Sequence, residues 1–245
     1  MTIRIAVWSG PRNISTAMMR SWDSRADTSV MDEPFYGAYL RTTGASHPMR
    51  DEIMAAHSTD WDEIAEDCAG RTGTPVIYQK HMCQHMVVQA PTAWMAGLRH
   101  AFLIRSPEQV AASFAEKWDG LGPDDLGFRR QAELFDQVCQ DRSTAPPVLE
   151  SQDVLAAPEE MLRAMCAGLG VPFDNAMLGW RPGPRDTDGV WAAHWYNAVN
   201  QSTGFAKPRV PKAPPEALQG IVEICRPHYE TMYRHRIQRS ETVAQ

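Results

Sequence analysis

The chain has 245 residues, 43% of them hydrophobic, so it can bury one α/β core, and we expect a single domain over residues 1–245. Its net charge of -6 and the lack of any run of about 18 apolar residues argue against nucleic-acid and membrane partners. The five cysteines are scattered without short paired spacings, which excludes a zinc ribbon and is typical of reduced thiols in a cytoplasmic protein.

Short apolar or β-branched runs alternate with helical patterns along the chain. The runs are Ile3–Trp8, Thr28–Met31, Pro75–Tyr78, His100–Ile104 and Pro147–Leu149. The helical patterns are Ser15–Ser24, Asp60–Gly70, Pro107–Lys117, Leu126–Arg142, Pro158–Leu169 and Pro214–Arg234. This alternation predicts an α/β fold with a central parallel sheet flanked by helices. Residues 37–59 and 180–215 show no regular pattern and are predicted to be long loops.

The first run ends in a turn suited to an anion. A strand that stops at Ser9 and restarts as a helix near Asn13 points unpaired backbone N–H groups beyond the strand's carboxyl end, where phosphates bind. The candidate ligands of this loop are Arg12, Asn13, Ser15 and Thr16. The loop lacks the Gly-Lys-Ser/Thr ending of nucleoside-triphosphate loops, so a magnesium-dependent kinase or ATPase is disfavoured.

A second candidate phosphate site follows the fourth run. Arg105 stands at the end of this run, and Ser113 lies eight positions later in the next helical pattern. A guanidinium suits phosphate because its planar fork matches two oxygens and keeps its charge. The alternative is that Arg105 pairs with a surface carboxylate and that Ser113 faces solvent or its own helix.

In order and spacing, these motifs resemble the sulfotransferase family. Residues 11–16, Pro-Arg-Asn-Ile-Ser-Thr, are similar to its phosphosulfate loop, and Arg105 with Ser113 is similar to its 3′-phosphate motif. Residues 147–174 are similar to its last strand, helix and Leu-Gly-Leu-Pro turn. The resemblance implies a three-layer P-loop nucleotide-binding fold. It also implies a transferase that moves a sulfuryl group from 3′-phosphoadenosine-5′-phosphosulfate to a small hydroxyl or amine acceptor without a metal.

One departure from the family pattern bears on donor binding. Ile14 stands where the family usually has glycine, and its side chain either blocks close approach of the donor or packs under the loop. Two alternatives to a sulfotransferase therefore stay open. They are a phosphoryl-transfer enzyme on the same scaffold and a nucleotide-binding relic without activity.

Two residues are candidates for the catalytic base that the resemblance implies. Glu33 follows the second run in a Glu-Pro pair similar to that of some bacterial sulfotransferases, and we favour it slightly. His81, preceded by Lys80, follows the third run, where eukaryotic members place a lysine and a histidine base. The ordinary alternatives are a helix-capping carboxylate and a polar residue at a helix start. His81 and His85 have a helical metal-binding spacing but no glutamate between them, so we expect no metal site.

The segment 180–215 is dense in tryptophan, tyrosine and small turn residues. Aromatic rings are costly to leave in water, so this segment is expected to fold over something, either as a clamp on the core or as a lid over donor and acceptor. Lys207 and Arg209 are its candidate donor contacts. Its Asp-Gly-Val-Trp, Trp-Tyr and Ser-Thr-Gly-Phe pieces also resemble a sulfotransferase-like subgroup that includes plant proteins labelled aminotransferase-like.

Overall fold

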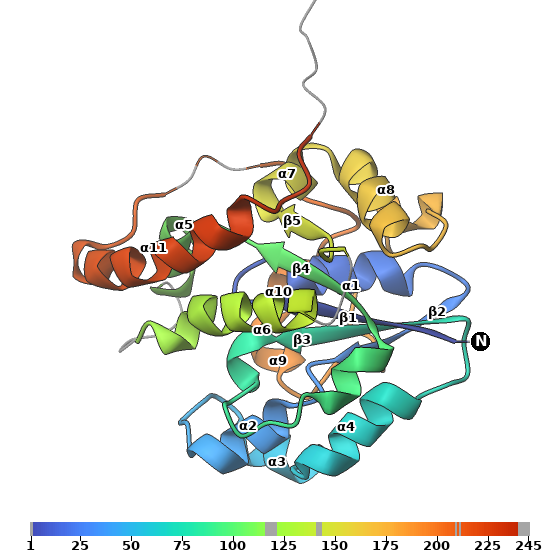
Figure 1. Cartoon of the computed structure of the whole chain (residues 1–245), viewed down its shortest axis with the longest axis horizontal. Helices are drawn as coiled ribbons and strands as arrows, with labels where there is room; N and C mark the ends of the chain where they lie inside the picture. Colours follow the sequence, from blue (N-terminus) through green and yellow to red (C-terminus); the bar gives the residue numbers. More distant parts are fainter. Residues whose placement is uncertain (1, 116–121, 141–143, 209, 211, 240–245) are drawn as a thin grey trace, which may run out of the picture.

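The computed structural model describes residues 2–115, 122–140, 144–208, 210 and 212–239. Five parallel strands form its sheet, in the order β2-β3-β1-β4-β5 (Figure 1). They are β1 (Ile3–Ser9), β2 (Thr28–Asp32), β3 (Val76–Met82), β4 (Arg99–Ile104) and β5 (Val148–Glu150). Each predicted run thus forms a strand, and the predicted fold class is confirmed. Because β1 lies in the middle of the sheet, the loop after it opens at the centre of the carboxyl edge, where α/β folds bind ligands.

Helices cover both faces of the sheet. The α-helices are α1 (Ser15–Asp23), α2 (Tyr36–Thr43), α3 (Arg50–Ala56), α4 (Trp61–Gly70), α5 (Pro107–Ala115), α6 (Phe128–Gln140), α7 (Ser151–Ala156), α8 (Pro158–Gly168), α9 (Ala192–Trp195), α10 (Asn197–Asn200) and α11 (Gln219–Tyr233). Met18 of α1 and Met161 of α8 belong to the core on one face, and Ile64 of α4 and Leu134 of α6 to the core on the other. These layers agree with the three predicted from the resemblance.

The third strand is longer than predicted, and this changes the setting of two candidate site residues. β3 continues to Met82, so Lys80 and His81 lie inside the strand rather than after it. Successive side chains of a strand point to opposite faces, so these two neighbours point away from each other. His85 lies in a single 3₁₀ turn (Cys83–His85), so the helical spacing considered for His81 and His85 does not exist.

The prediction of a long loop at residues 37–59 is wrong, because α2 and α3 occupy most of it. The α2 helix carries a glycine and two threonines and has no side-chain N-cap, so its local sequence gives little sign of a helix. Burial of Tyr36, Tyr39 and Leu40 in the core stabilises it instead. Gly37 allows the chain after α3 to approach α2 closely, since a Cβ at position 37 would lie 2.8 Å from the Ser58 carbonyl oxygen.

The described part of the aromatic segment, residues 180–215, is held in place by packing rather than by long helices or strands. It contains the short helices α9 and α10, and Trp180, Trp191 and Tyr196 are buried. Within the described part of the chain, no helix is both long and apolar enough to span a bilayer.

Candidate active site

The loop between β1 and α1 is held in a strained conformation. Arg12 and Ile14 have φ values of 59° and 51°, in the left-handed region that non-glycine residues rarely adopt. For a β-branched residue such as Ile14 this is a clear outlier, and such strain is concentrated at functional sites. The Ile14 side chain packs against the hydrophobic core. The family's glycine is therefore replaced by a residue that keeps the glycine-like backbone and packs its partly buried side chain against the core.

Buried contacts fix the position of this loop. The Asn13 amide donates to the Leu103 carbonyl at 2.5 Å and accepts from the Ser151 hydroxyl. Its side chain, 3% exposed, therefore anchors the loop to β4 and α7 instead of facing a ligand. Ser15 and Thr16 lie in the first turn of α1, where backbone N–H groups have no partner within the helix. Gly10 is required by packing, because a Cβ there would lie 2.7 Å from the Leu126 carbonyl oxygen.

The structure brings the two predicted phosphate motifs together. Arg105 donates from Nη1 to the Arg12 carbonyl oxygen at 2.6 Å, and its Nε donates to Gln109 at 3.1 Å. Arg12 donates from Nε to the Ser113 hydroxyl at 3.0 Å. Burial lowers the pKa of the Arg105 guanidinium, with Glu150 opposing the shift and Arg12 adding to it. A partly buried pair of arginines beside a helix N-terminus is a setting that favours a polyanion.

A buried cluster of charges lies at the ends of β2 and β3. The Lys80 ammonium contacts Asp32 Oδ1 at 2.9 Å, Glu33 Oε1 at 2.5 Å and the Tyr196 hydroxyl at 2.5 Å. The Tyr196 hydroxyl in turn contacts both oxygens of Asp32, at 2.8 and 2.7 Å. Glu33 has a φ of 43°, so its backbone is also in the strained left-handed region. Lys80 is 2% exposed and Glu33 9%, so the cluster is nearly closed to water.

The two carboxylates of this cluster share a single ammonium. Burial raises the pKa of Glu33, and the nearby Lys80 opposes that shift without cancelling it. Burial alone would lower the pKa of Lys80, but Asp32 and Glu33 together raise it, so the ammonium stays charged. Glu33 is therefore the member of the cluster that takes up a proton at a higher pH than an ordinary glutamate does.

His81 lies on the opposite face of the sheet from this cluster. Its ring stacks on Trp8 with centroids 4.5 Å apart, and its Nε2 pairs with the Gln79 side-chain oxygen at 3.0 Å. Burial lowers the pKa of His81 to about 3, and the residue is 1% exposed. The structure thus brings Lys80, but not His81, to Glu33. We interpret His81 as a packing residue. The ordinary alternative for it, a polar residue at a helix start, does not describe where it lies, because His81 is inside β3.

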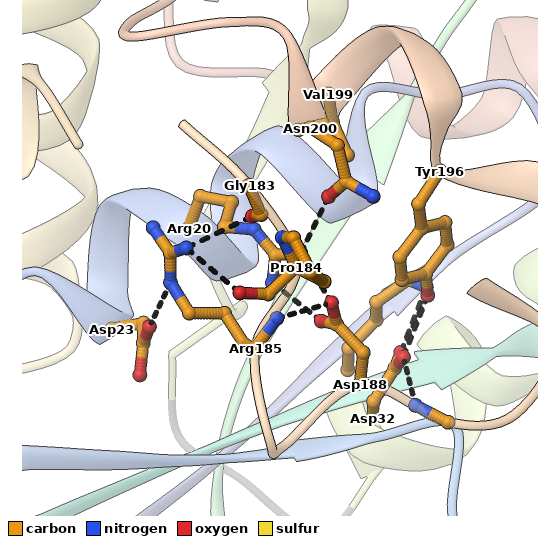
Figure 2. A network of polar contacts seen from close by, with 12 residues as sticks. Arg20, Asp23, Asp32, Gly183, Pro184, Arg185, Asp188, Tyr196, Val199 and Asn200 are labelled. Atoms are coloured by element: carbon orange, nitrogen blue, oxygen red, sulfur yellow. Dashed lines mark hydrogen bonds and ion pairs between the residues drawn. The ribbon is translucent and has the colours of Figure 1, made fainter. Parts of the chain in front are cut away.

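The aromatic segment is fastened to α1 by a buried ion pair (Figure 2). Arg20 donates to both oxygens of Asp188 at 2.6 Å, and the exposed fractions of the two side chains are 1% and 4%. Asn200 contacts the same guanidinium at 3.3 Å, and Arg185 lies 3.4 Å from Asp23. The segment therefore lies along the helix that begins at the phosphate loop.

The same segment also reaches the charge cluster. Figure 2 shows Tyr196 pointing to Asp32, and the Gly189 N–H donates to Asp32 Oδ2 at 3.2 Å. The segment is thus a clamp that supplies one side of the candidate site. Within this segment the Lys207 side chain is exposed, and Arg209 lies outside the described residues.

The sequence-based interpretation missed several residues that build this site: Arg20, Asp32, Asp188 and Tyr196. An aspartate directly before the favoured Glu33 was the one local signal, since paired carboxylates at a strand end often share a cation. The other three give no local signal. Among the described residues, no group of three or more His, Cys, Asp or Glu side chains is placed to hold a metal ion.

Comparison with known proteins adds a family and two groups of relatives. A family model described as "Sulfotransferase domain" matches residues 3–236. "Branched-chain-amino-acid aminotransferase-like protein 1" of Arabidopsis thaliana is 34% identical over 230 residues, which is 93% of this chain and 41% of that protein. Protein 2 of the same name and plant is 32% identical over 98% of this chain and 43% of its own length. The chain thus spans less than half the length of these curated relatives.

Solved structures share the fold at low identity. The sulfotransferase domain from the curacin biosynthetic pathway superposes with a TM-score of 0.54 and 15% identity, covering 91% of this chain and 97% of that domain. A sulfotransferase from Alicyclobacillus acidocaldarius gives a TM-score of 0.54 and 12% identity, covering 97% and 98%. At these identities the likeness concerns the arrangement of helices and strands.

Proposed function

Because the chain belongs to the sulfotransferase-domain family, we propose that it moves a sulfuryl group from 3′-phosphoadenosine-5′-phosphosulfate to a small hydroxyl or amine acceptor. The observation that carries this proposal is the meeting of Arg12, Arg105 and Ser113 at the loop after β1. Two guanidinium groups and a helix N-terminus are a donor set that fits a nucleotide with several phosphate groups. The chain covers less than half of its curated relatives, so the names of those whole proteins supply no substrate here.

The donor, when bound, supplies an activated sulfuryl group whose departure leaves charge on a bridging oxygen. Arg105 and Ser113 would hold its 3′-phosphate, and the first turn of α1 with Arg12 would hold the phosphosulfate. Arg12 is suited to stabilise the charge on the leaving oxygen, and this role needs no metal ion. Glu33 would remove the acceptor proton, with Lys80 fixing one of its carboxylate oxygens.

Removing the Arg105 guanidinium is expected to weaken binding of adenosine 3′,5′-bisphosphate by about 1.5–3 kcal/mol, the range for hydrogen bonds to a charged group. Isothermal titration calorimetry on Arg105→Ala measures this, and Arg4→Ala is the control, because Arg4 bonds the Gly70 and Arg71 carbonyls away from the loop. An unchanged dissociation constant in Arg105→Ala would overturn the 3′-phosphate assignment.

Loss of the Arg12 side chain should affect turnover more than binding. Its charge is needed most when the bridging oxygen becomes negative, so Arg12→Ala is expected to lower kcat on the order of 10²-fold while weakening bisphosphate binding less. Single-turnover release of the bisphosphate, together with calorimetry on the same variant, separates the two effects. Equal losses in rate and affinity would show that Arg12 only binds.

Calorimetric titration of the wild-type protein with adenosine 3′,5′-bisphosphate, with and without magnesium, separates the proposed function from its alternatives. A sulfotransferase binds the bisphosphate equally well with and without magnesium. A phosphoryl-transfer enzyme on this scaffold would need the metal for its nucleotide, and a relic would bind none. Ile14 is the residue that bears on the choice between a sulfotransferase and a relic, and the packing of its side chain against the core supports a loop open to the donor.

A further inference from the structure

A buried histidine ring lies beside Glu33. His85 is 2% exposed, and its ring stacks on Tyr36 and Tyr39 with centroid separations of 4.3 and 4.9 Å. Its Nδ1 is without a hydrogen-bond partner among the described residues. It lies 3.9 Å from Glu33 Oε2, the oxygen that Lys80 does not occupy. A buried polar atom left unsatisfied next to a candidate base points to a missing group at that place.

The distance between His85 Nδ1 and Glu33 Oε2 suits one bridging oxygen atom. At 3.9 Å they are too far apart to bond each other, but one oxygen atom can lie about 2.8 Å from both. Such an oxygen would touch the candidate base with one side and the imidazole with the other.

The charges around His85 determine which nitrogen carries its proton. Burial lowers the pKa of His85, and His47, Lys80 and His81 add to this, so the ring is neutral and has one N–H. Near Glu33, the Lys80 ammonium lies on Oε1, and Asp32 and Tyr196 contact Lys80. Tyr196 also hydrogen-bonds Glu33, and the nearby Tyr36 pairs its hydroxyl with His47. The charged oxygen nearest to Nδ1 is thus Glu33 Oε2, and its negative charge favours the tautomer with the hydrogen on Nδ1.

We propose that Glu33 and His85 dock the acceptor as a hydroxyl, which donates its hydrogen to Glu33 Oε2 and accepts the His85 Nδ1 hydrogen. The inference rests on the proposed function and narrows its acceptor to alcohols. An alcohol oxygen has two lone pairs, so it can accept from His85 with one and attack sulfur with the other. A neutral amine has a single lone pair, which is used in the attack, so an N–H facing the His85 N–H is repelled.

The transfer step balances with these groups. The acceptor O–H bond breaks and its proton passes to Glu33 Oε2, while the acceptor oxygen forms a bond to sulfur. The bond from sulfur to the bridging oxygen breaks, and adenosine 3′,5′-bisphosphate leaves with that electron pair. His85 keeps its proton throughout, so it acts as a positioning residue for the attacking oxygen.

The tautomer of His85 can be read without any acceptor, by long-range ¹H–¹⁵N NMR of the imidazole rings in the ¹⁵N-labelled protein. His85→Phe, which keeps a ring between the two tyrosines, assigns the signal. His100 is an internal reference with the opposite tautomer. Trp8 donates to its Nδ1 at 3.0 Å, and its Nε2 faces the Met95 carbonyl oxygen at 2.9 Å. We expect hydrogen on Nδ1 in His85 and on Nε2 in His100. Hydrogen on Nε2 of His85 would overturn the inference.

A second arm tests the acceptor class with primary alcohols and primary amines of matched carbon skeletons. We expect transfer to alcohols to exceed transfer to the matched amines at least tenfold, and His85→Phe to lower kcat for alcohols about tenfold. Equal or faster transfer to amines would overturn the inference and leave the proposed function standing. If the wild-type protein does not bind the bisphosphate, that result would instead contradict the proposed function. If no probe is sulfated, the tautomer decides the inference.

Discussion

Replacing Glu33 with glutamine is expected to lower kcat by about 10²–10⁴-fold, the usual worth of a positioned general base. Glutamine keeps the shape of the side chain and can still accept from Lys80 Nζ through its amide oxygen, but it cannot take up a proton. The dissociation constant of adenosine 3′,5′-bisphosphate should change less than about twofold, because the base contacts the acceptor rather than the donor. Steady-state kinetics and calorimetry on the same preparation measure both quantities.

The matched control is His81→Asn on the other face of the sheet. This variant loses a stacked, buried ring, so it is expected to lower the free energy of unfolding while leaving kcat per folded molecule nearly unchanged. Full activity in Glu33→Gln together with an inactive but folded His81→Asn would reverse the assignment of the base.

The pH dependence of the wild-type rate follows from the same group. A base must be unprotonated to act, and burial raises the pKa of Glu33, so kcat falls as pH decreases through this raised pKa. The loss therefore sets in at a higher pH than for a solvent-exposed glutamate. A kcat that stays constant down to the ordinary glutamate range would show that Glu33 does not limit the reaction.

Asp188→Ala is expected to lower the free energy of unfolding by about 3–5 kcal/mol, the cost of leaving one member of a buried ion pair without its partner. Arg20 is 1% exposed and has its closest contacts with Asp188, so its charge would stay buried, with the Asn200 side chain and the Tyr196 ring still beside it. Urea denaturation monitored by tryptophan fluorescence measures the change, and Trp191 in the clamp is a convenient reporter.

Asp186→Ala serves as the control for this variant. Asp186 has the same chemistry and lies two positions away, but it is exposed, so its loss should change the stability by less than about 0.5 kcal/mol. Similar midpoints for Asp188→Ala and Asp186→Ala would show that the ion pair contributes little to the fold.

The sequence was a good guide to the strands because each is an apolar run, and a poor guide to where β3 ends. Gln79, Lys80 and His81 are polar but fully buried, which a local pattern interprets as the end of a strand. Their polar groups are satisfied by distant partners: Gln79 bonds the Cys68 carbonyl, and Lys80 bonds Asp32 and Glu33. No property of the three residues alone predicts those contacts.

The candidate site shows the same division between local and distant information. The phosphate loop, Arg105 and Glu33 lie at strand ends or helix starts, where position in a motif indicates a role, and Ser113 lies near the end of the helix that follows Arg105. Tyr196 reaches Asp32 across 164 positions, and Asp188 reaches Arg20 across 168. Such pairs are made by the fold, so neither residue could be assigned to the site from the sequence.

The ion pair between Arg20 and Asp188 also sets an order of events during translation. When α1 and the first strands have left the ribosome, the residues that neutralise Arg20 and complete the contacts of Asp32 have not yet been synthesised. A nascent chain cannot bury these charges unpartnered without a large cost, so this side of the sheet must stay hydrated until the clamp emerges. A chain that stalls before residue 188 would therefore leave the Arg20 and Asp32 side chains without these partners.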